Sequence, residues 1–244
     1  MTEIVARRGA DRPATVDDVI ITGRRQEKLD AAVSANPKLK AIRSDAADPS
    51  ALAAMCREIK QTASKLNVLV NNAGVLVYRN LGVADDDLAS LTSEIDINVS
   101  GPIRMVSALV DLLKANKGTI INVSSGLAFV PLTAAPIYSA TKAAIHAYTI
   151  TLRQQLQSHG VEVIELMPPA VKTDLADYPD EPSFKVISTD ELMAATFGAL
   201  GKGTLEIRPG QPNSLRFMSR VAPAFIQAQL EKGSKSLIPT ASRQ

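Results

Sequence analysis

The chain has 244 residues, of which 45% are hydrophobic and 21% are charged, so it can bury the core of one large domain and is not disordered by composition. Its net charge of +2 is too close to neutral to indicate a nucleic acid or a membrane surface as a partner. The single cysteine, Cys56, excludes an internal disulfide, and no apolar run is long enough to span a membrane. We therefore expect a cytoplasmic protein in which Cys56 is a small apolar residue of a helix rather than a reactive thiol.

Short apolar runs alternate with longer helical patterns along the chain. The predicted elements are, in order, strand 19–22, helix 27–35, strand 39–42, helix 49–65, strand 68–70, helix 86–114 with a bend near Gly101, strand 119–123, helix 138–158, strand 161–166 and strand 205–207. Most strands are rich in Val and Ile and lack polar alternation, which is typical of a parallel sheet buried on both faces. The pattern predicts a doubly wound, Rossmann-like α/β fold with a single domain over residues 19–244.

Two helix ends carry clear signals. Asp48 is expected to cap the helix that begins at Pro49, because a carboxylate accepts from the free amides of a first turn and proline suits its first position. Gly160 is expected to end the helix 138–158.

Tyr138 and Lys142 lie four residues apart in a predicted helix, so their side chains share one face. An ammonium beside a phenol lowers the pKa of the phenol, and such a tyrosine can exchange a proton with an alcohol or carbonyl oxygen near neutral pH. The spacing alone also fits an ordinary pair on a helix surface, so the neighbouring motifs decide the interpretation.

Polar residues at predicted strand ends supply that context. Ser125 follows the strand before Tyr138, where ligands bind in open α/β sheets, and its hydroxyl can steady charge on a reacting oxygen. Asn71-Asn72-Ala73-Gly74 follows another strand. Asn98 lies inside a long predicted helix, where a polar side chain needs a reason.

In this order and spacing, Asn71-Asn72-Ala73-Gly74, Asn98, Ser125 and Tyr138-x-x-x-Lys142 resemble the short-chain dehydrogenase/reductase family over roughly residues 19–210. These enzymes move a hydride between NAD(P) and a carbonyl or alcohol. The resemblance implies that Tyr138 is the general acid in reduction and the general base in oxidation, and that Ser125 orients the substrate oxygen. It also implies that Lys142 lowers the pKa of Tyr138 and holds the nicotinamide ribose. Asn98 would hold a water that links Lys142 to solvent.

The resemblance extends to residues that would hold the cofactor. Asn72 and Gly74 would shape the strand end beside it, with Asn71 structural. Asp45 and Ala46 would lie beside the adenine, although Asp45 could simply end a strand.

A proline-rich stretch, Pro168-Pro169-Ala170-Val171-Lys172-Thr173, resembles the family's Pro-Gly-x-Val-x-Thr with Pro169 in place of the glycine. The Val171 backbone and the Thr173 hydroxyl would then meet the nicotinamide carboxamide. The alternative is a surface loop without a ligand.

The choice between NAD and NADP depends on the residues after the second strand of such a fold. Arg24 and Arg25 occupy that place and offer planar donor groups suited to a 2′-phosphate, which favours NADP over NAD. Two solvated arginines at a helix start are the alternative.

The glycine-rich turn that binds the pyrophosphate is missing. Gly9 and Gly23 are the only glycines before Gly74, and neither lies in a glycine-rich pattern. We therefore treat residues 1–18 as an atypical N-terminal segment that does not form the usual first β–α unit. Ile4-Val5-Ala6 or another chain could fill the central place of that strand in the sheet.

Two functions remain open at this point. The first is an NADP-dependent oxidoreductase acting on a small carbonyl or alcohol. The second is a non-catalytic relative with impaired cofactor binding that acts as a binding or interaction protein. The family forms homodimers or homotetramers through the Asn98 and Tyr138 helices, and no His or Cys cluster predicts a metal site.

A looser resemblance concerns the C-terminal part. Residues 206–211 and the helix predicted from Pro223 resemble a branch named after the lipoteichoic acid D-alanylation locus. This resemblance names no substrate.

Overall fold

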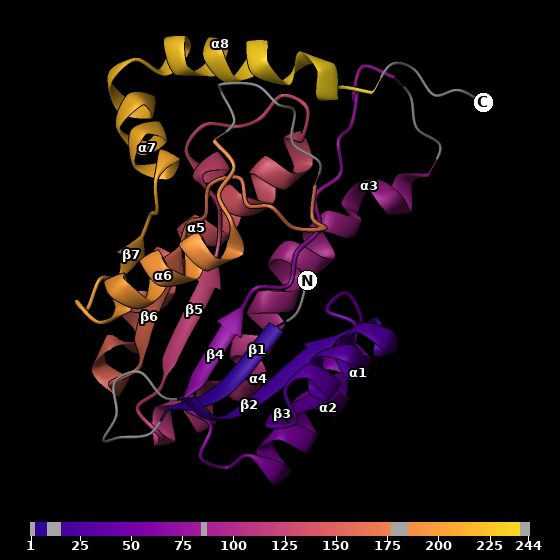
Figure 1. The fold of residues 1–244 in the computed structure, drawn as a ribbon, viewed down its shortest axis with the longest axis vertical. Helices are drawn as coiled ribbons and strands as arrows, with labels where there is room; N and C mark the ends of the chain where they lie inside the picture. The colour runs from indigo at the N-terminus through magenta and orange to yellow at the C-terminus, as the bar shows by residue number, and fades with distance from the viewer. Residues whose placement is uncertain (1–2, 9–15, 84–86, 177–184, 240–244) are drawn as a thin grey trace. The chain divides into compact units, whose positions relative to one another are not determined.

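The computed structural model describes residues 3–8, 16–83, 87–176 and 185–239 (Figure 1). The chain divides into two compact units. The first unit comprises Met1–Gly74, Asp96–Val123 and Tyr148–Glu165, and the second comprises Val75–Ile95, Ser124–Ala147 and Leu166–Gln244. Among the described residues, no helix is both long and apolar enough to cross a membrane.

The first unit is built on a sheet of Val- and Ile-rich strands. These are β1 (Glu3–Arg8), β2 (Val16–Gly23), β3 (Leu39–Arg43), β4 (Val68–Asn71), β5 (Thr119–Val123) and β6 (Glu162–Leu166), in the spatial order β3-β2-β1-β4-β5-β6. The pairs β2–β3 and β4–β5 are parallel, as the lack of polar alternation predicted. The predicted strands of this unit are confirmed, and β2 begins at Val16, three residues before its expected start.

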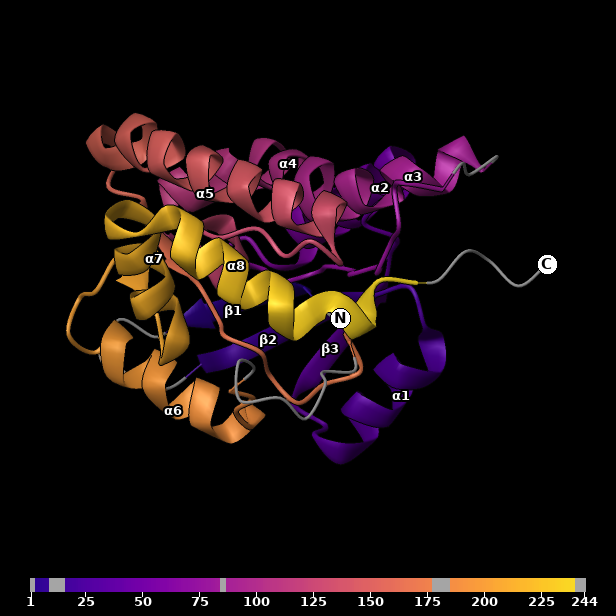
Figure 2. The ribbon, with the colours of Figure 1, turned by 90° about the horizontal axis from the view of Figure 1, so that it is seen from above.

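Helices cover both faces of this sheet. Figure 2 shows α2 (Pro49–Thr62) and α4 (Gly101–Ala115) on one face of the strands and α1 (Gln26–Ala35) on the other. Buried side chains of α2 and α4 share one apolar core with side chains of β4 and β5. The helices contribute Leu52, Ile59, Met105 and Leu109, and the strands contribute Leu69 and Ile120. Cys56 is buried in this core with its Sγ 3.7 Å from Met105 Sδ, which confirms its predicted place on an apolar helix face.

Local signals in the sequence fix several element ends. Asp48 Oδ1 accepts hydrogen bonds from the amides of Ser50 (2.7 Å) and Ala51 (3.2 Å), as expected for the cap of α2. Gly160 has a φ of 71° directly after the short 3₁₀ turn that follows α5 (Pro136–Leu156), which is a left-handed stop that glycine adopts without strain.

The long predicted helix is divided where a bend was expected. It consists of α3 (Leu88–Ile95), a π-helical turn at Asp96–Ser100 and α4. A Cβ placed on Gly101 would lie 3.1 Å from the Ala46 carbonyl oxygen, so a larger residue could not let the turn after β3 approach α4 this closely.

The N-terminal strand β1 fills the central place that the missing first β–α unit leaves. It lies between β2 and β4 and is antiparallel to both, with Ile4 opposite Ile21 and Val5 opposite Leu69. Ile4-Val5-Ala6 thus occupies the gap, one of the two possibilities that the sequence left open. Because β1 is antiparallel to β2, its first residue, Glu3, lies beside Thr22 near the carboxyl end of β2. The last residue of β1, Arg8, lies beside Val16 at the amino end of β2.

The second unit contains α3, the first part of α5 and the C-terminal elements. The latter are α6 (Thr189–Leu200), β7 (Glu206–Ile207), α7 (Gln211–Val221) and α8 (Pro223–Ser234). Ser188 caps α6, because its hydroxyl accepts from the Glu191 amide while the Glu191 carboxylate accepts from the Ser188 amide. An apolar cluster joins α7 and α8 to the start of α5 through Leu215, Leu230 and Tyr138.

Candidate active site

Tyr138 and Lys142 lie in the first two turns of α5, and both are buried, with 6% and 5% of their surfaces exposed. The Lys142 Nζ is 5.4 Å from the centroid of the Tyr138 ring. Pro136 occupies the first position of the helix, where its fixed φ is favourable. An ammonium held this close to a buried phenol favours the phenolate, which is the arrangement that proton exchange at a tyrosine requires.

A hydroxyl fixes the loop before the helix. Ser139 Oγ accepts from the Leu132 amide (3.0 Å) and donates to the Ala135 carbonyl (2.9 Å). The same loop packs in the apolar cluster around Tyr138. Hydrogen bonds of Ser139 and apolar packing therefore fix the segment that carries Tyr138.

Ser125 follows β5 and belongs, like Tyr138, to the second unit. The preceding Ser124 amide donates to the Leu166 carbonyl (2.9 Å), and the Ser125 hydroxyl accepts from the Leu127 amide (3.1 Å) at the start of a short 3₁₀ turn. Leu127 belongs to the cluster that contains Tyr138. Ser125 is thus held at a strand end beside the apolar surroundings of the tyrosine.

The proline-rich stretch is attached to the Ser125 loop, because the Gly126 amide donates to the Pro168 carbonyl (3.4 Å). Val171 is buried and forms a parallel bridge with Ile187, with the Lys172 amide donating to the Ile187 carbonyl at 2.9 Å. Thr173 is exposed, and its hydroxyl accepts from the Leu175 amide. Backbone contacts therefore connect this stretch to the Ser125 loop and to Ile187.

The predicted nucleotide-binding residues lie in the first unit. Arg24 and Arg25 are exposed at the junction of β2 and α1. The Arg43 Nε donates to the Arg24 carbonyl (3.2 Å), which brings a third guanidinium to the same strand ends. Arg43 lies at the end of a strand and belongs to no motif, so no sequence pattern marks it as a candidate.

The turn after β3 is fixed against α4. Asp45 Oδ1 accepts from the Ala47 amide (2.9 Å), and Arg104 Nη1 donates to the Ala47 carbonyl (3.4 Å). Ala46 approaches Gly101 as described above. Ser44 Oγ is buried and has no hydrogen-bond partner among the described residues, so a polar group is still available at this strand end.

A buried amide network supports the end of β4. Asn71 Nδ2 donates to Asn122 Oδ1 (2.8 Å), and Asn122 Nδ2 donates to Thr149 Oγ1 (2.9 Å). These contacts agree with the structural role expected for Asn71. Asn72 and Gly74 continue from this anchored strand end.

Asn98 is buried in the π-helical turn between α3 and α4. Such turns cost hydrogen-bond geometry and occur frequently at functional sites, because they alter the direction of a side chain within a helix.

The predicted residues therefore fall into two groups. Ser125, Tyr138, Lys142, Val171 and Thr173 lie in the second unit; Arg24, Arg25, Asp45, Ala46, Asn72, Gly74 and Asn98 lie in the first. The residues expected at the two ends of a nicotinamide dinucleotide are present. Residues 9–15, between β1 and β2, lie outside the described part of the chain, and their sequence carries no glycine-rich turn of the kind that holds a pyrophosphate.

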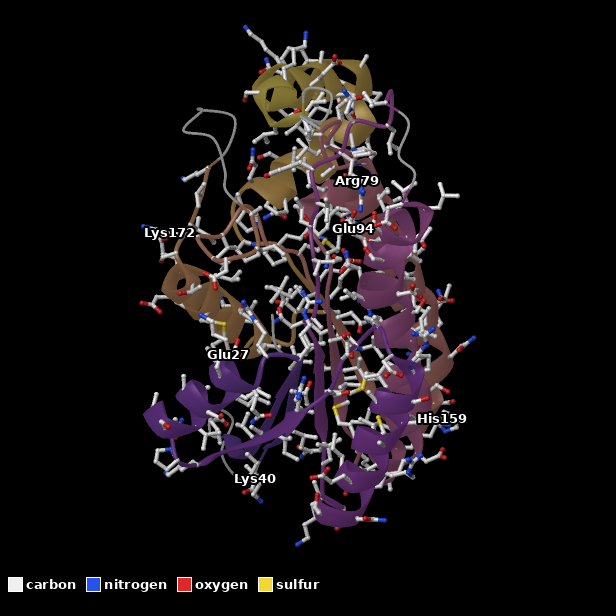
Figure 3. All side chains as sticks on the ribbon, turned by 90° about the vertical axis from the view of Figure 1, so that its right-hand side faces the viewer. Glu27, Lys40, Arg79, Glu94, His159 and Lys172 are labelled. Carbon is white, nitrogen blue, oxygen red and sulfur yellow. The ribbon has the colours of Figure 1, made fainter. Side chains whose placement is uncertain are left out.

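One buried ion pair was not expected from the sequence. Glu94 is buried in α3, and its Oε2 lies 3.8 Å from the Nε of Arg79, a residue of the segment after β4 (Figure 3). Glu94 Oε1 also accepts from the Val77 amide (3.3 Å), and Arg79 Nη2 donates to the Ser90 carbonyl (2.7 Å). Burial raises the pKa of Glu94, while the Val77 amide and Arg79 oppose that shift.

This pair holds the segment that borders Tyr138. Leu76 and Tyr78 pack against the Tyr138 cluster, and the Arg79 amide donates to the Ala134 carbonyl (2.9 Å). Fifteen residues separate Arg79 from Glu94, so no short motif could have revealed the pairing. The described residues contain no group of three or more His, Cys, Asp or Glu side chains that could hold a metal ion.

Comparison with known proteins identifies the family. The sequence matches the short chain dehydrogenase family over residues 5–182, which is most of its length. The chain belongs to the short-chain dehydrogenase/reductase family. It is an oxidoreductase of this type, and the Rossmann-like α/β fold agrees with that of its structural relatives.

Several short-chain dehydrogenases and their relatives are similar over most of the chain. An uncharacterized oxidoreductase of Bacillus subtilis (strain 168), DltE, is 34% identical over 208 residues, covering 84% of this chain and 82% of that protein. An NADPH-dependent 1-acyldihydroxyacetone phosphate reductase of Schizosaccharomyces pombe is 33% identical over 162 residues, covering 66% of this chain and 53% of that protein. A short chain dehydrogenase of Burkholderia cenocepacia J2315, solved in complex with NADP, is 27% identical with a TM-score of 0.73, covering 86% and 84% of the two chains.

Proposed function

We propose that this protein is an NADP-dependent oxidoreductase that interconverts a carbonyl and an alcohol, with Tyr138 as the general acid and base. The observation that carries the proposal is the buried pair of Tyr138 and Lys142, whose Nζ lies 5.4 Å from the phenol ring. Burying a lysine costs free energy, and buried charged residues beside a second titratable group are often found at functional sites. Family membership supports the same reaction class.

The proton chemistry follows from these side chains. In reduction, the Tyr138 hydroxyl gives its proton to the substrate oxygen while Ser125 orients that oxygen. Lys142 stabilises the phenolate that remains, and Asn98 holds a water through which the proton is replaced from solvent. A bound nicotinamide cofactor supplies the hydride in reduction and takes it up in oxidation. In oxidation the phenolate accepts the alcohol proton, so charge and protons balance in both directions.

Arg24 and Arg25 support NADP as the cofactor, and Arg43 strengthens the argument. Three guanidinium groups at the ends of β2 and β3 match a 2′-phosphate better than a 2′-hydroxyl. The Burkholderia relative with bound NADP and the yeast NADPH-dependent reductase point the same way. Asp45 and Ala46 would border the adenine, Asn72 and Gly74 would shape the strand end beside the cofactor, and Val171 and Thr173 would meet the nicotinamide carboxamide.

The surroundings of Tyr138 support an apolar substrate. Leu76, Leu127 and Phe129 are partly buried against the Tyr138 cluster. A carbonyl carried on an apolar chain would bury that chain here, and the yeast relative is named for an acylated ketone.

We further propose a cytoplasmic homodimer or homotetramer. Exposed small residues along α5, namely Ala140, Ala143, Ala144 and Ala147, and the exposed Ile103 on α4 support contacts through these two helices.

A second candidate is a non-catalytic relative with weak cofactor binding. The antiparallel β1 supports it, because this strand occupies the place from which the chain would otherwise enter a glycine-rich turn and a helix. Losing two charge-assisted contacts to the pyrophosphate would weaken cofactor binding about 100-fold or more.

Cofactor titration distinguishes the two candidates. Purified protein is titrated with NADPH and NADH, following the fluorescence of the bound nicotinamide. Micromolar binding of NADPH with much weaker binding of NADH supports the oxidoreductase. Absence of binding at millimolar cofactor in a folded sample contradicts it and favours the binding protein.

A further inference from the structure

Helix α7 has apolar side chains on two opposite faces. Leu215 is buried in the cluster that contains Tyr138, and Pro212 is buried beside it in the helix. Phe217 and Val221 lie one turn apart on the other face and are 63% and 65% exposed. A helix on the surface of a globular protein needs only one apolar face, so packing within the described chain does not account for the outer face of α7.

The exposed apolar surface continues at the start of α8. Phe225 lies in the first turn of that helix, four residues after Val221, and is 57% exposed. Helices α7 and α8 contact one another and meet at a corner (Figure 1). We call Phe217, Val221 and Phe225 the outer apolar patch.

Basic residues accompany this patch. Arg220 is exposed on α7 about 60° around the helix from Phe217, at the border of the patch, and Lys232 lies on the same stripe of α8 as Phe225, two turns later. Lys235 follows and is also exposed. Exposed aromatic rings with cationic neighbours are characteristic of surfaces that lie on anionic lipid.

The charge of the chain is unevenly distributed. From Glu206 to Pro239 there are five basic residues (Arg208, Arg216, Arg220, Lys232 and Lys235) and two acidic ones (Glu206 and Glu231), a net charge of +3. The whole chain carries +2, so the rest sums to −1. Glu206 is itself paired with Arg208 and Arg216, which leaves the basic residues on the outside of α7 and α8 to determine the local potential.

From these observations we propose that the α7–α8 corner docks on an anionic lipid surface, with the outer apolar patch entering the interface and Arg220, Lys232 and Lys235 contacting headgroups. A second copy of the chain would place this basic surface against itself, which like charges oppose. The total charge of the chain is near neutral, so this proposal rests on the local distribution of charge and on the outer apolar patch.

Docking in this way would bring the catalytic side chain close to the lipid. The inner faces of α7 and α8 contact the Tyr138 cluster through Leu215 and Leu230, so one layer of helices separates Tyr138 from the proposed interface. The proposal does not depend on cofactor binding or turnover.

The test is sedimentation of the full chain with extruded vesicles, without cofactor or substrate. Vesicles of phosphatidylcholine alone are compared with vesicles of equal parts phosphatidylcholine and phosphatidylglycerol. The protein should bind the anionic vesicles and bind the neutral ones much more weakly. The double variant Phe217→Ser/Phe225→Ser should lose about tenfold or more in affinity, because two aromatic side chains no longer enter the interface.

Matched variants separate docking from general effects. Phe197 on α6 is as exposed as Phe225, so Phe197→Ser removes the same kind of side chain and should bind as wild type. Lys232→Gln should reduce affinity about fivefold, whereas Lys38→Gln, the same charge change in the first unit, should not. Circular dichroism confirms that each variant is folded.

Three results would overturn the proposal. They are absence of binding to anionic vesicles, equal binding to both vesicle types, and wild-type binding by the double phenylalanine variant. A fourth such result could come from sedimentation equilibrium without lipid. If the wild type is a dimer and Phe217→Ser/Phe225→Ser is a monomer, a second copy of the chain covers the patch. Because no readout involves NADPH, a failure of the oxidoreductase proposal would leave these results unchanged.

Discussion

Lys142 holds its ammonium 5.4 Å from the ring of Tyr138, and both side chains are almost completely buried on the same face of α5. A buried cation is costly without a compensating group, and the proposed mechanism assigns that role to Tyr138 in its phenolate form.

Replacing the phenol should therefore remove the chemistry and spare binding. We expect Tyr138→Phe to lower kcat about 10²- to 10⁴-fold, which is the usual contribution of a general acid or base, while the Kd for NADPH changes little. Stopped-flow absorbance with a panel of apolar ketones measures kcat, and nicotinamide fluorescence measures Kd. Tyr148 provides the control on the same helix, because burial raises its pKa to about 12 and Tyr148→Phe should retain activity. Full activity of Tyr138→Phe would exclude the proposed role.

The arginines at the ends of β2 and β3 should set the preference for NADP. The double variant Arg24→Ala/Arg25→Ala removes donors to the 2′-phosphate and should weaken NADPH binding about 100-fold or more, because each charge-assisted contact contributes roughly 1.5–3 kcal/mol. NADH lacks that phosphate and should bind as it does to wild type. Arg57→Ala, at an exposed position of α2, is the matched control. An equal loss for both cofactors would show that the arginines act on the fold instead.

Much of the fold could be predicted because its signals are local. The apolar runs gave the parallel strands, Asp48 and Gly160 marked helix ends, and Gly101 marked the bend before α4. The contacts that could not be predicted join residues far apart in sequence. Arg43, at the end of β3, donates a hydrogen bond to the carbonyl of Arg24, just after the neighbouring strand β2. Arg79, in the segment after β4, forms an ion pair with Glu94 of α3. Neither contact has a periodicity or spacing that sequence patterns can register.

The direction of β1 was equally beyond the sequence. The sequence allows Ile4-Val5-Ala6 to take the place of the usual first strand, but three apolar residues can pair with neighbouring strands in either direction. The antiparallel register with both β2 and β4 is a property of the assembled sheet. The motif of Tyr138 and Lys142 was easier to recognise, because the two residues lie one helical turn apart and their spacing is visible in the sequence.

Glu94 should make stability fall as the pH rises. Its pKa in the folded protein is raised above the ordinary value of 4.5, so the folded state holds the proton more tightly than the unfolded state. The stabilisation is complete below the ordinary pKa and is lost as the pH rises through the raised value. Relative to wild type, Glu94→Gln should therefore gain stability as the pH rises above the ordinary pKa of 4.5. Urea unfolding across this range measures the difference in the free energy of unfolding.

Glu191 supplies a control of opposite sign. Hydrogen bonds from the backbone and side chain of Ser188 lower its pKa, so the folded protein holds that proton more weakly. Glu191→Gln should lose stability relative to wild type as the pH rises from acid through the ordinary pKa. If both variants show the same pH dependence, the buried contacts of Glu94 are not the cause.

Strand β1 should be necessary for the sheet although it carries no part of the candidate site. Each residue from Ile4 to Ala6 lies between two strands, so its amide has a neighbour to pair with on one side or the other. Val5→Pro removes a donor from this central strand and should destabilise the protein by about 1–3 kcal/mol, because a buried acceptor loses its partner. Val5→Ile keeps a β-branched side chain and should unfold as wild type. Urea unfolding followed by circular dichroism distinguishes them, and equal stability would show that β1 does not pair as described.

Grafting a first β–α unit of the usual kind onto the chain should raise its affinity for NADPH. In this variant, residues 1–18 are replaced by a strand, a Thr-Gly-x-x-x-Gly-x-Gly turn and a helix, so that a parallel strand takes the place of β1 and amides at the helix start face the pyrophosphate. The Kd for NADPH should fall about 100-fold or more, since two recovered charge-assisted contacts suffice for that change. A second graft with the three glycines changed to valine keeps the strand and helix but blocks the close backbone approach, so it should not improve binding. If both grafts bind NADPH no better than the natural chain, the antiparallel β1 is not what limits cofactor affinity.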